Sequence, residues 1–387
     1  MFAFLTRYFP TPPLFNPYFF TYSQIHTIML THALFFVLGL ITLVIGAEVL
    51  VRGASRLTLS LGVSPLVVGL TVVAFGTSTP ELAVSVGAAL GGSPDLAIGN
   101  VVGSNIANIL LILGISALIA PLVVHEQIIR QEIPIMIGAT LLMLVMALDG
   151  SISRLEAGVL FALVIAYTVF LVRQSRKASR EAEDEFAAEM PGDSQWDRHW
   201  SVQLALIIAG LGALVLGSNW LVGAAVAFAQ AFGVSDLVIG LTVVAVGTSM
   251  PEIATSIIAA LRGQRDIAVG NVVGSNVFNV FAVIGATGLV SAGGVPVSEA
   301  ARNFDLWVMV AVALACVPIM ITGREIARWE GGVFLGYYAA YTAWLVLNAQ
   351  SHTVLPMFSH VMLAYVMPLT VITLIVSFMR HNHRSAG

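Results

Sequence analysis

The stretch "GLTVVAFGTSTPELAVS" at residues 69–85 combines the apolar run of a membrane helix with residues that interrupt one. After the apolar half, small and hydroxyl residues lead to Pro80 and Glu81. Proline has no N–H to donate, so the carbonyl of Gly76 loses its helical partner. A carboxylate at the middle of a bilayer costs about 2.5–3.5 kcal/mol on insertion scales, which makes Glu81 a candidate functional residue.

The chain contains this stretch twice. "GLTVVAVGTSMPEIATS" at 240–256 repeats it, and "GNVVGSNIAN" at 99–108 returns as "GNVVGSNVFN" at 270–279, both at an offset of 171 residues. Further on the offset becomes 174, where "RLEAG" at 154 matches "RWEGG" at 328. The sequence therefore contains two copies of one unit, over about 31–173 and 201–348.

The composition is that of a membrane protein. Of the 387 residues, 58% are hydrophobic and only 10% are charged, against about 25% charged in soluble domains. A membrane span needs about 20 apolar residues. We find eleven candidate spans, near residues 32–53, 65–90, 98–120, 131–148, 155–173, 201–228, 236–261, 269–291, 304–322, 330–348 and 356–379.

Each copy holds five of these spans, and an odd number of crossings inserts the second copy upside down. Inverted repeats are typical of secondary transporters, which bind their substrates where the repeats meet. We therefore predict an all-α polytopic protein with a ten-helix core of two inverted five-helix repeats and one extra C-terminal helix. Residues 174–200 are interpreted as a cytoplasmic linker, and 349–387 as the extra helix with its tail.

Orientation follows from the basic residues. With eleven spans and the N-terminus outside, 14 of the 17 Lys and Arg residues face inward, and only Arg7, Arg154 and Arg302 face outward. The positive-inside rule then places the C-terminus in the cytoplasm. Residues 1–30 lack the features of a signal peptide, and Met29 is an alternative start, so we treat them as an untranslated or disordered extension.

Polar side chains recur at helical spacing around each proline and in the following span. Residues at i, i+3, i+4 and i+7 share one face of a helix. These residues are Ala74, Thr77, Ser78 and Glu81, repeated by Ala245, Thr248, Ser249 and Glu252, with the pairs Ser104/Asn108 and Ser275/Asn279 in the next span. If they converge, they form a cage of carboxylate, hydroxyl, amide and carbonyl oxygens.

An all-oxygen cage selects hard cations such as Ca²⁺. The single cysteine, Cys316, and histidines without metal-ligand spacing argue against zinc or copper. Two carboxylates carry a charge of −2, which one Ca²⁺ or two monovalent cations neutralise. Helix packing is an alternative role for the hydroxyl residues. Asp305 falls at the end of a span, where we expect it to contact water, and Glu48 is expected to be an edge residue.

The motif pairs "GTSTPE" and "GTSMPE", each followed by "GNVVGSN", resemble the two alpha repeats of the calcium/cation antiporter superfamily, and most of all its bacterial sodium/calcium exchanger branch. The resemblance covers about 31–348. It implies ion binding between the second and third helices of each repeat. The ligands it implies are Glu81, Glu252, Thr77, Ser78, Thr248, Ser249, Ser104, Asn108, Ser275, and the carbonyls of Ala74 and Ala245.

The chain departs from the family pattern at Asn279, where several members carry an aspartate that adds a third acidic group. Here both third-helix positions are asparagine, Asn108 and Asn279. The cage is therefore less negative. This argues against the potassium co-transport that potassium-dependent members link to that acid, and it leaves the number of coupled sodium ions open.

These observations predict a Ca²⁺:Na⁺ antiporter of a bacterial inner membrane that extrudes Ca²⁺ by alternating access. The leading alternative is a Ca²⁺:H⁺ exchanger, since a carboxylate can release protons instead of sodium. An intramembrane enzyme is disfavoured because no nucleophile–base pairing is evident, and single-chain inverted repeats disfavour a channel. We expect Ca²⁺, Na⁺ and the lipid bilayer as partners, with no cofactor, no nucleic acid and no obligatory protein partner.

Overall fold

The computed structural model describes residues 22–61, 64–94, 96–175, 199–232, 245–373 and 376. Nearly all of them are helical. Four sequence predictions fall partly elsewhere, the first being the end of the last span and its tail (374–375 and 377–387). Most of the N-terminal extension (1–21), most of the linker (176–198) and the start of the span at 236–261 lie outside the described residues.

The first repeat contains a broken second helix and π-helical turns, which are labelled η. Its elements are α2 (Tyr22–Leu61), α3 (Pro65–Val68), η1 (Gly69–Val73), α4 (Ala74–Thr77), α5 (Thr79–Leu90), α6 (Leu96–Ala107), η2 (Asn108–Leu113), α7 (Gly114–Ile119), β1 (Leu122–Val123), η3 (Ile128–Glu132), α8 (Ile133–Ala147), β2 (Ser151–Ile152) and α9 (Arg154–Ser175).

The second repeat follows the same order, and the π-helical turns recur in the third and fourth helices. Its elements are α11 (Trp200–Ala231), α13 (Ala245–Thr248), α14 (Met250–Leu261), α15 (Arg265–Phe278), η6 (Asn279–Ile284), α16 (Gly285–Val290), β3 (Val295–Pro296), η7 (Ala301–Asp305), α17 (Leu306–Ile321), β4 (Glu325–Ile326) and α18 (Arg328–Ala349). The extra helix comprises α19 (Leu355–Val361) and η8 (Met362–Val366).

Two short antiparallel ribbons confirm that the repeats are inverted. β1 pairs with β4, with Leu122 opposite Ile326, and β2 pairs with β3, with Ile152 opposite Val295. Each ribbon therefore contains one strand from each repeat. The chain reaches α8 from β1 and leaves it into β2, whereas it reaches α17 from β3 and leaves it into β4. The two equivalent helices thus connect the same two ribbons in opposite directions.

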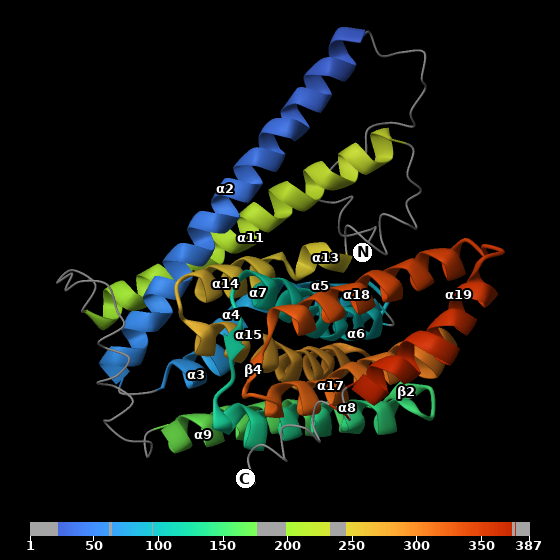
Figure 1. Ribbon diagram of the computed structural model, residues 1–387. Helices are drawn as coiled ribbons and strands as arrows, with labels where there is room; N and C mark the ends of the chain where they lie inside the picture. The colour runs from blue at the N-terminus through green and yellow to red at the C-terminus, as the bar shows by residue number, and fades with distance from the viewer. Residues whose placement is uncertain are drawn as a thin grey trace.

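The first helices of the two repeats, α2 and α11, pack against each other and lie to one side of the other helices (Figure 1). They are antiparallel, because Gly39 meets Leu221 whereas Gly46 meets Leu214. A Cβ atom at Gly39 would lie 2.7 Å from the backbone nitrogen of Leu221. Only glycine allows this close approach, as at many helix contacts in membranes.

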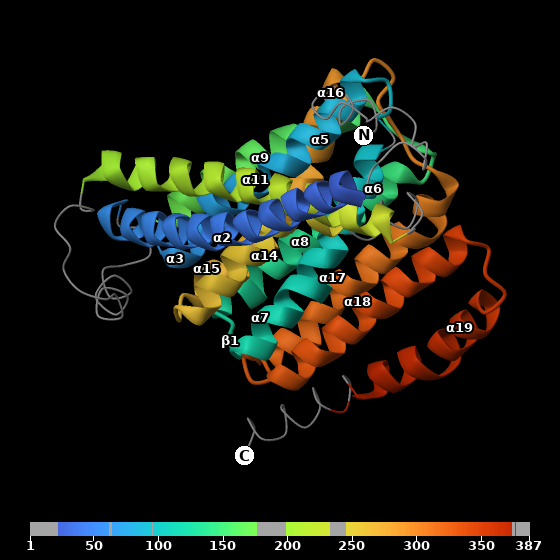
Figure 2. The same ribbon diagram turned by 90° about the horizontal axis from the view of Figure 1, so that it is seen from above.

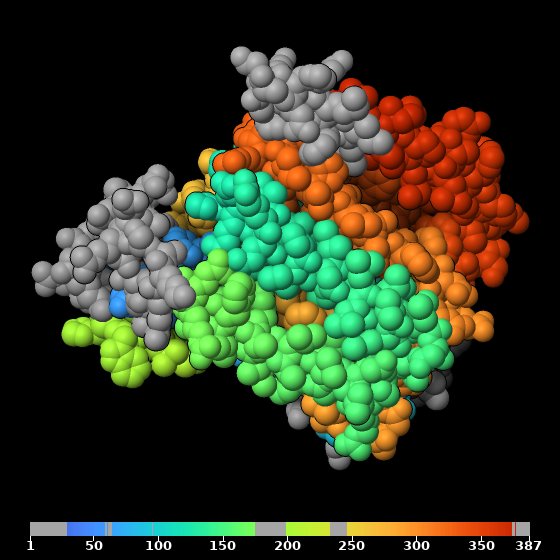
Figure 3. Space-filling view, turned by 90° about the horizontal axis from the view of Figure 1, so that it is seen from below, coloured from blue at the N-terminus to red at the C-terminus, as the bar shows by residue number. Residues whose placement is uncertain are grey.

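The third helices form the centre of the molecule. The most apolar part of α15–α16 is entirely buried and that of α6–α7 largely so, whereas no residue in the most apolar part of the extra helix is buried. Seen from above, α19 lies at the edge, next to α18 (Figure 2). Teal and green atoms of α8 and α9 fill the centre of the view from below (Figure 3), on the side away from α2 and α11 in Figure 1. The site predicted on the second and third helices is therefore interior.

Eight helices among the described residues are long and apolar enough to cross a membrane, or nine if a bent pair counts as one span. The sequence predicts eleven spans. Two of the predicted spans are therefore not among the nine. The span at 236–261 begins in residues that the structure does not describe. The other is α18, which has 22 residues but is made less apolar by Tyr337, Tyr338 and Tyr341.

Candidate ion-binding site

The second helix of the first repeat is broken where the sequence predicts. The segments Pro65–Thr77 and Thr79–Leu90 meet at an angle of 42°. Ser78 between them has φ −82° and ψ 5°, and Pro80 is the second residue of the second segment. Ser249 has nearly the same backbone, with φ −86° and ψ 9°. Both glutamates consequently lie in the first turn of a helix, where the helix dipole favours a negative charge.

The carbonyls freed by the two prolines differ between the repeats. The hydroxyl of Ser218 on α11 donates to the Gly247 carbonyl over 2.8 Å. The residue equivalent to Ser218 in α2 is Ala47, which has no hydroxyl to offer Gly76. The Ala74 carbonyl accepts from the Ser78 N–H at 3.0 Å. Its role as an ion ligand stays a prediction, as does that of Ala245, whose backbone begins α13.

The two carboxylates are buried, with Glu81 0% and Glu252 1% exposed. Each receives a hydroxyl from the other repeat. Ser78 Oγ donates to Glu252 Oε1 over 3.1 Å, and Ser249 Oγ donates to Glu81 Oε1 over 3.3 Å. Ser104 Oγ also donates to Glu81 Oε1, over 3.4 Å. The structure thus brings the carboxylates and serines of both broken helices together.

The threonines of this face lie beside the same carboxylates, Thr77 near Glu252 and Thr248 near Glu81. Thr77 Oγ1 also donates to Asn271 Oδ1 over 3.0 Å. Each broken helix therefore presents the adjacent Thr and Ser of its repeated motif to the carboxylate of the other repeat. Such reciprocal contacts are expected where two inverted repeats meet.

Five side-chain oxygens of the predicted ligands are buried and have no hydrogen-bond partner among the described residues. They are Oε2 of Glu81 and Glu252, Oδ1 of Asn108 and Asn279, and Oγ of Ser275. Native proteins contain only a few such atoms per 100 residues. Within the described chain, these oxygens gather on the two inverted motifs, where a hard cation would satisfy them.

Sequence reasoning missed Asn100 and Asn271, although the repeated "GNVVGSN" contains both. Asn100 Nδ2 donates to the backbone carbonyl of Glu81 over 3.2 Å and to Ser85 Oγ over 3.0 Å. Asn271 Nδ2 donates to Ser256 Oγ over 2.9 Å. These amides fasten each broken helix to the neighbouring third helix. Their identical position in the two copies was the available signal.

Two further acidic side chains, Glu132 and Asp305, lie outside the cage, one in each repeat, and we call them the second acidic pair. Each accepts a hydrogen bond from a tyrosine. Glu132 is 0% exposed and accepts from the Tyr167 hydroxyl over 2.7 Å. The equivalent pair in the second repeat is Asp305 and Tyr341, joined over 2.9 Å. Asp305 was expected to contact water, and it is partly exposed, but Tyr341 on α18 also donates a hydrogen bond to it. Glu48 does lie near a surface, and it forms an ion pair with Arg262.

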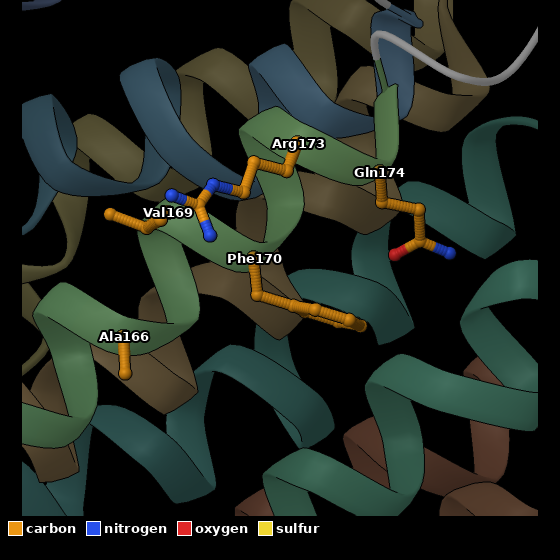
Figure 4. A pocket seen from close by; sticks show the side chains of 5 residues that line it. All are labelled: Ala166, Val169, Phe170, Arg173 and Gln174. Carbon is orange, nitrogen blue, oxygen red and sulfur yellow. The ribbon is translucent and has the colours of Figure 1, made fainter.

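A hollow of about 650 Å³ lies along one side of α9 and contains none of the cage residues. Figure 4 shows its side chains, which recur at helical spacing along one face of α9, with the Arg173 side chain extending back toward Val169. Gln174 also donates to Gln131, the neighbour of Glu132, over 2.7 Å. This hollow therefore belongs to the surroundings of the second acidic pair.

Comparison with known proteins agrees with this geometry. The family "Sodium/calcium exchanger protein" matches residues 31–173 and 202–347. The inner membrane protein YrbG of Escherichia coli K12 is 34% identical over 325 residues, which cover 82% of this chain and 97% of that protein. The sodium/calcium exchanger MaX1 of Methanosarcina acetivorans is 35% identical over 340 residues, covering 80% and 96%.

Solved structures of the sodium-calcium exchanger NCX_Mj match the fold with a TM-score of 0.69 and 32% identity, covering 81% of this chain and 98% of that chain. Together with the inverted repeats, these findings define a multi-pass membrane transporter of the calcium/cation antiporter superfamily, not an enzyme. The chain belongs to the sodium/calcium exchanger family.

Proposed function

We propose that this protein exchanges Ca²⁺ for Na⁺ by alternating access and that its main direction is Ca²⁺ extrusion. The observation that carries the proposal is the pair of buried carboxylates, Glu81 and Glu252, each with one oxygen that no described donor satisfies. Their combined charge of −2 is neutralised equally by one Ca²⁺ or by two Na⁺. That equivalence lets either ion occupy the same residues in turn.

The neutral oxygens of the cage support Na⁺ as the counter-ion. A proton needs only a carboxylate to bind, whereas Na⁺ needs several oxygens around it. The unpartnered amide oxygens of Asn108 and Asn279 and the hydroxyl of Ser275 supply such oxygens. The name of MaX1, a sodium/calcium exchanger, agrees with this assignment. Ca²⁺:H⁺ exchange is the alternative that the transport experiment must separate.

The proposal includes a location and an orientation. We assign the protein to a bacterial inner membrane with the N-terminus outside and the C-terminus in the cytoplasm. The excess of basic residues on one side supports the orientation, and the name of the Escherichia coli relative supports the membrane. In this orientation the β1–β4 ribbon faces the cytoplasm. A reporter fused to the C-terminus that is active only in the cytoplasm tests this arrangement.

Ca²⁺ uptake into inside-out vesicles tests the exchange itself. Vesicles loaded with Na⁺ should take up Ca²⁺ from a Na⁺-free bath, and dissipating the Na⁺ gradient should stop the uptake. A pH gradient alone should drive little uptake. Uptake that follows the pH gradient and ignores Na⁺ would replace Na⁺ coupling with H⁺ coupling. No Ca²⁺ uptake under either gradient would overturn the proposed function.

A further inference from the structure

Two buried asparagines of the third helices, Asn105 and Asn276, are not among the predicted ligands but contact them. Asn105 Nδ2 donates to the backbone carbonyl of Asn276 over 3.3 Å. A backbone carbonyl can only accept a hydrogen bond, so Asn105 must turn its nitrogen toward it and its oxygen away. That oxygen accepts from Asn279 Nδ2 over 3.0 Å. Asn279 therefore points its own oxygen in the remaining direction.

The second half of the site follows the same logic with a different anchor. Asn276 Nδ2 donates to the sulfur of Met136 on α8 over 3.4 Å. A thioether, like a carbonyl, is an acceptor only. The Oδ1 atom of Asn276 consequently faces away from Met136 and accepts from Asn108 Nδ2 over 2.9 Å. Asn108, too, has its nitrogen engaged and its oxygen without a described partner.

We propose that Asn105 and Asn276 are positioning residues that fix which way the two ligand amides point, with Met136 as the outer anchor of one relay. Each relay begins at a group that can only accept and ends at an amide oxygen presented to the cation. This inference rests on the proposed function in so far as Asn108 and Asn279 bind a cation.

Orientation matters because the two ends of a side-chain amide have nearly the same shape and opposite polarity. An amide turned by 180° would present its N–H donors to the cation instead of its oxygen. Without a fixed partner, an Asn side chain adopts either orientation at little cost. The relays remove this ambiguity, because all four asparagines are at most 2% exposed and water does not compete for their hydrogen bonds.

The same arrangement selects an amide over a carboxylate at position 279. A carboxylate there has no N–H and would face the Asn105 oxygen, an acceptor against an acceptor. Asn105 cannot turn to relieve this conflict without placing its own oxygen against the Asn276 carbonyl. The relay therefore disfavours an ionised side chain at position 279, which agrees with a total charge of −2 in the cage.

A double-mutant cycle between positions 105 and 279 tests the proposal. The apparent affinity of the purified full-length protein for Ca²⁺ and Na⁺ would be measured by thermal stabilisation. Asn105→Leu removes the acceptor, and we expect it to weaken cation binding by about tenfold or more. In the Asn279→Asp background the same substitution should leave affinity unchanged or raise it, because a leucine removes the opposing acceptor. An equal loss in both backgrounds indicates a structural role and overturns the proposal.

A milder cycle on the other relay covers the case in which Asn105→Leu does not fold. Met136→Leu nearly conserves volume, and such swaps usually cost less than about 1.5 kcal/mol of stability. It should lower affinity in the wild-type background and have no effect combined with Asn108→Asp. Equal effects in both backgrounds again contradict the relay. Ser116→Ala on α7 is the control, since it removes a buried hydroxyl outside the relays.

These cycles are independent of the transport result. A wild-type protein that binds Ca²⁺ or Na⁺ but does not exchange them loses the proposed function, while the cycles still decide the relay. A wild-type protein that no tested cation stabilises would overturn both proposals.

Discussion

The molecule contains two kinds of buried carboxylate, and the contrast between them identifies the functional one. Glu132 is as deeply buried as Glu81, but both of its oxygens have partners. Its Oε2 accepts from Tyr167, and its Oε1 accepts from Gln127 and Gln131. Glu81 and Glu252 each have one satisfied and one unsatisfied oxygen.

Burial alone would therefore not separate Glu132 from the two cage carboxylates. A carboxylate with complete hydrogen bonding is held in place by the protein and gains nothing from a cation. A buried carboxylate with an unsatisfied oxygen carries a desolvation cost that a bound cation can remove. The comparison predicts opposite phenotypes for the same substitution at the two kinds of site.

The largest effect is expected from Glu81→Gln and Glu252→Gln. Each glutamine keeps the shape and removes one of the two negative charges that a Ca²⁺ ion needs. Ca²⁺ uptake into vesicles should be abolished, whereas the melting temperature without ions should hold or rise because a buried charge is gone. Normal Ca²⁺ flux in either variant would rule out a site made of both carboxylates.

Glu132→Gln is the matched control, with the same chemistry at the same burial. We expect transport to persist and the protein to lose stability, because an amide nitrogen would meet donors that now bond a carboxylate. Hydrogen bonds to charged groups contribute about 1.5–3 kcal/mol each. Loss of transport with unchanged stability in this variant would show that the second acidic pair also belongs to the ion pathway.

Removing the proline that interrupts the second helix should have the next largest effect on transport. Pro80→Ala supplies an N–H to the Gly76 carbonyl and so favours a continuous helix through Ser78. Thermal stability should hold or rise, and Ca²⁺ uptake should fall several-fold as Glu81 moves relative to Glu252. Pro318→Ala is the control, because this proline lies inside α17 and outside the two repeated motifs, and it should leave uptake unchanged. Equal uptake by the Pro80→Ala and wild-type proteins would make the break incidental to ion binding.

Much of this site can be predicted from the sequence because the chain repeats it. Identical spacing in the two copies indicates that Glu81 and Glu252 have equivalent roles, and five spans per copy indicate inversion. These two observations predict the fold, and they predict that the two motifs lie next to each other inside it. The ribbons β1–β4 and β2–β3 were not predicted, since two-residue strands leave no periodic signal.

Other features depend on pairings between distant segments. Glu132 and Tyr167 lie 35 residues apart on different helices, and neither belongs to a motif. The orientation of Asn108 likewise depends on Met136, which only the folded chain brings near. The difference between Ser218 and Ala47 was readable as a break in the repeat, but its meaning required knowing that α11 passes the Gly247 carbonyl.

A smaller effect on transport is expected from changing the charge of the cage at Asn279. An amide oxygen contributes no charge, so the wild-type protein should exchange Ca²⁺ for Na⁺ equally well with and without K⁺ on either side. Asn279→Asp adds a third carboxylate, which should tighten cation binding and slow turnover. Na⁺-driven Ca²⁺ flux measured at several K⁺ concentrations decides the first point. A K⁺ requirement in the wild type would contradict the charge of −2 on which the exchange proposal rests.

The smallest effects should come from the tyrosines that satisfy the second acidic pair. Tyr167→Phe removes one hydrogen bond to a fully buried carboxylate, and about 1.5–3 kcal/mol of stability should be lost. Tyr341→Phe should cost less, because Asp305 is only partly buried and water can replace the hydroxyl. Melting temperatures of the two variants give the order, and Ca²⁺ uptake should stay near the wild-type level in both. If Tyr167→Phe lowered uptake without lowering stability, Glu132 would take part in transport although both of its oxygens have partners. An unpartnered oxygen would then not distinguish the ion-binding carboxylates from the structural one.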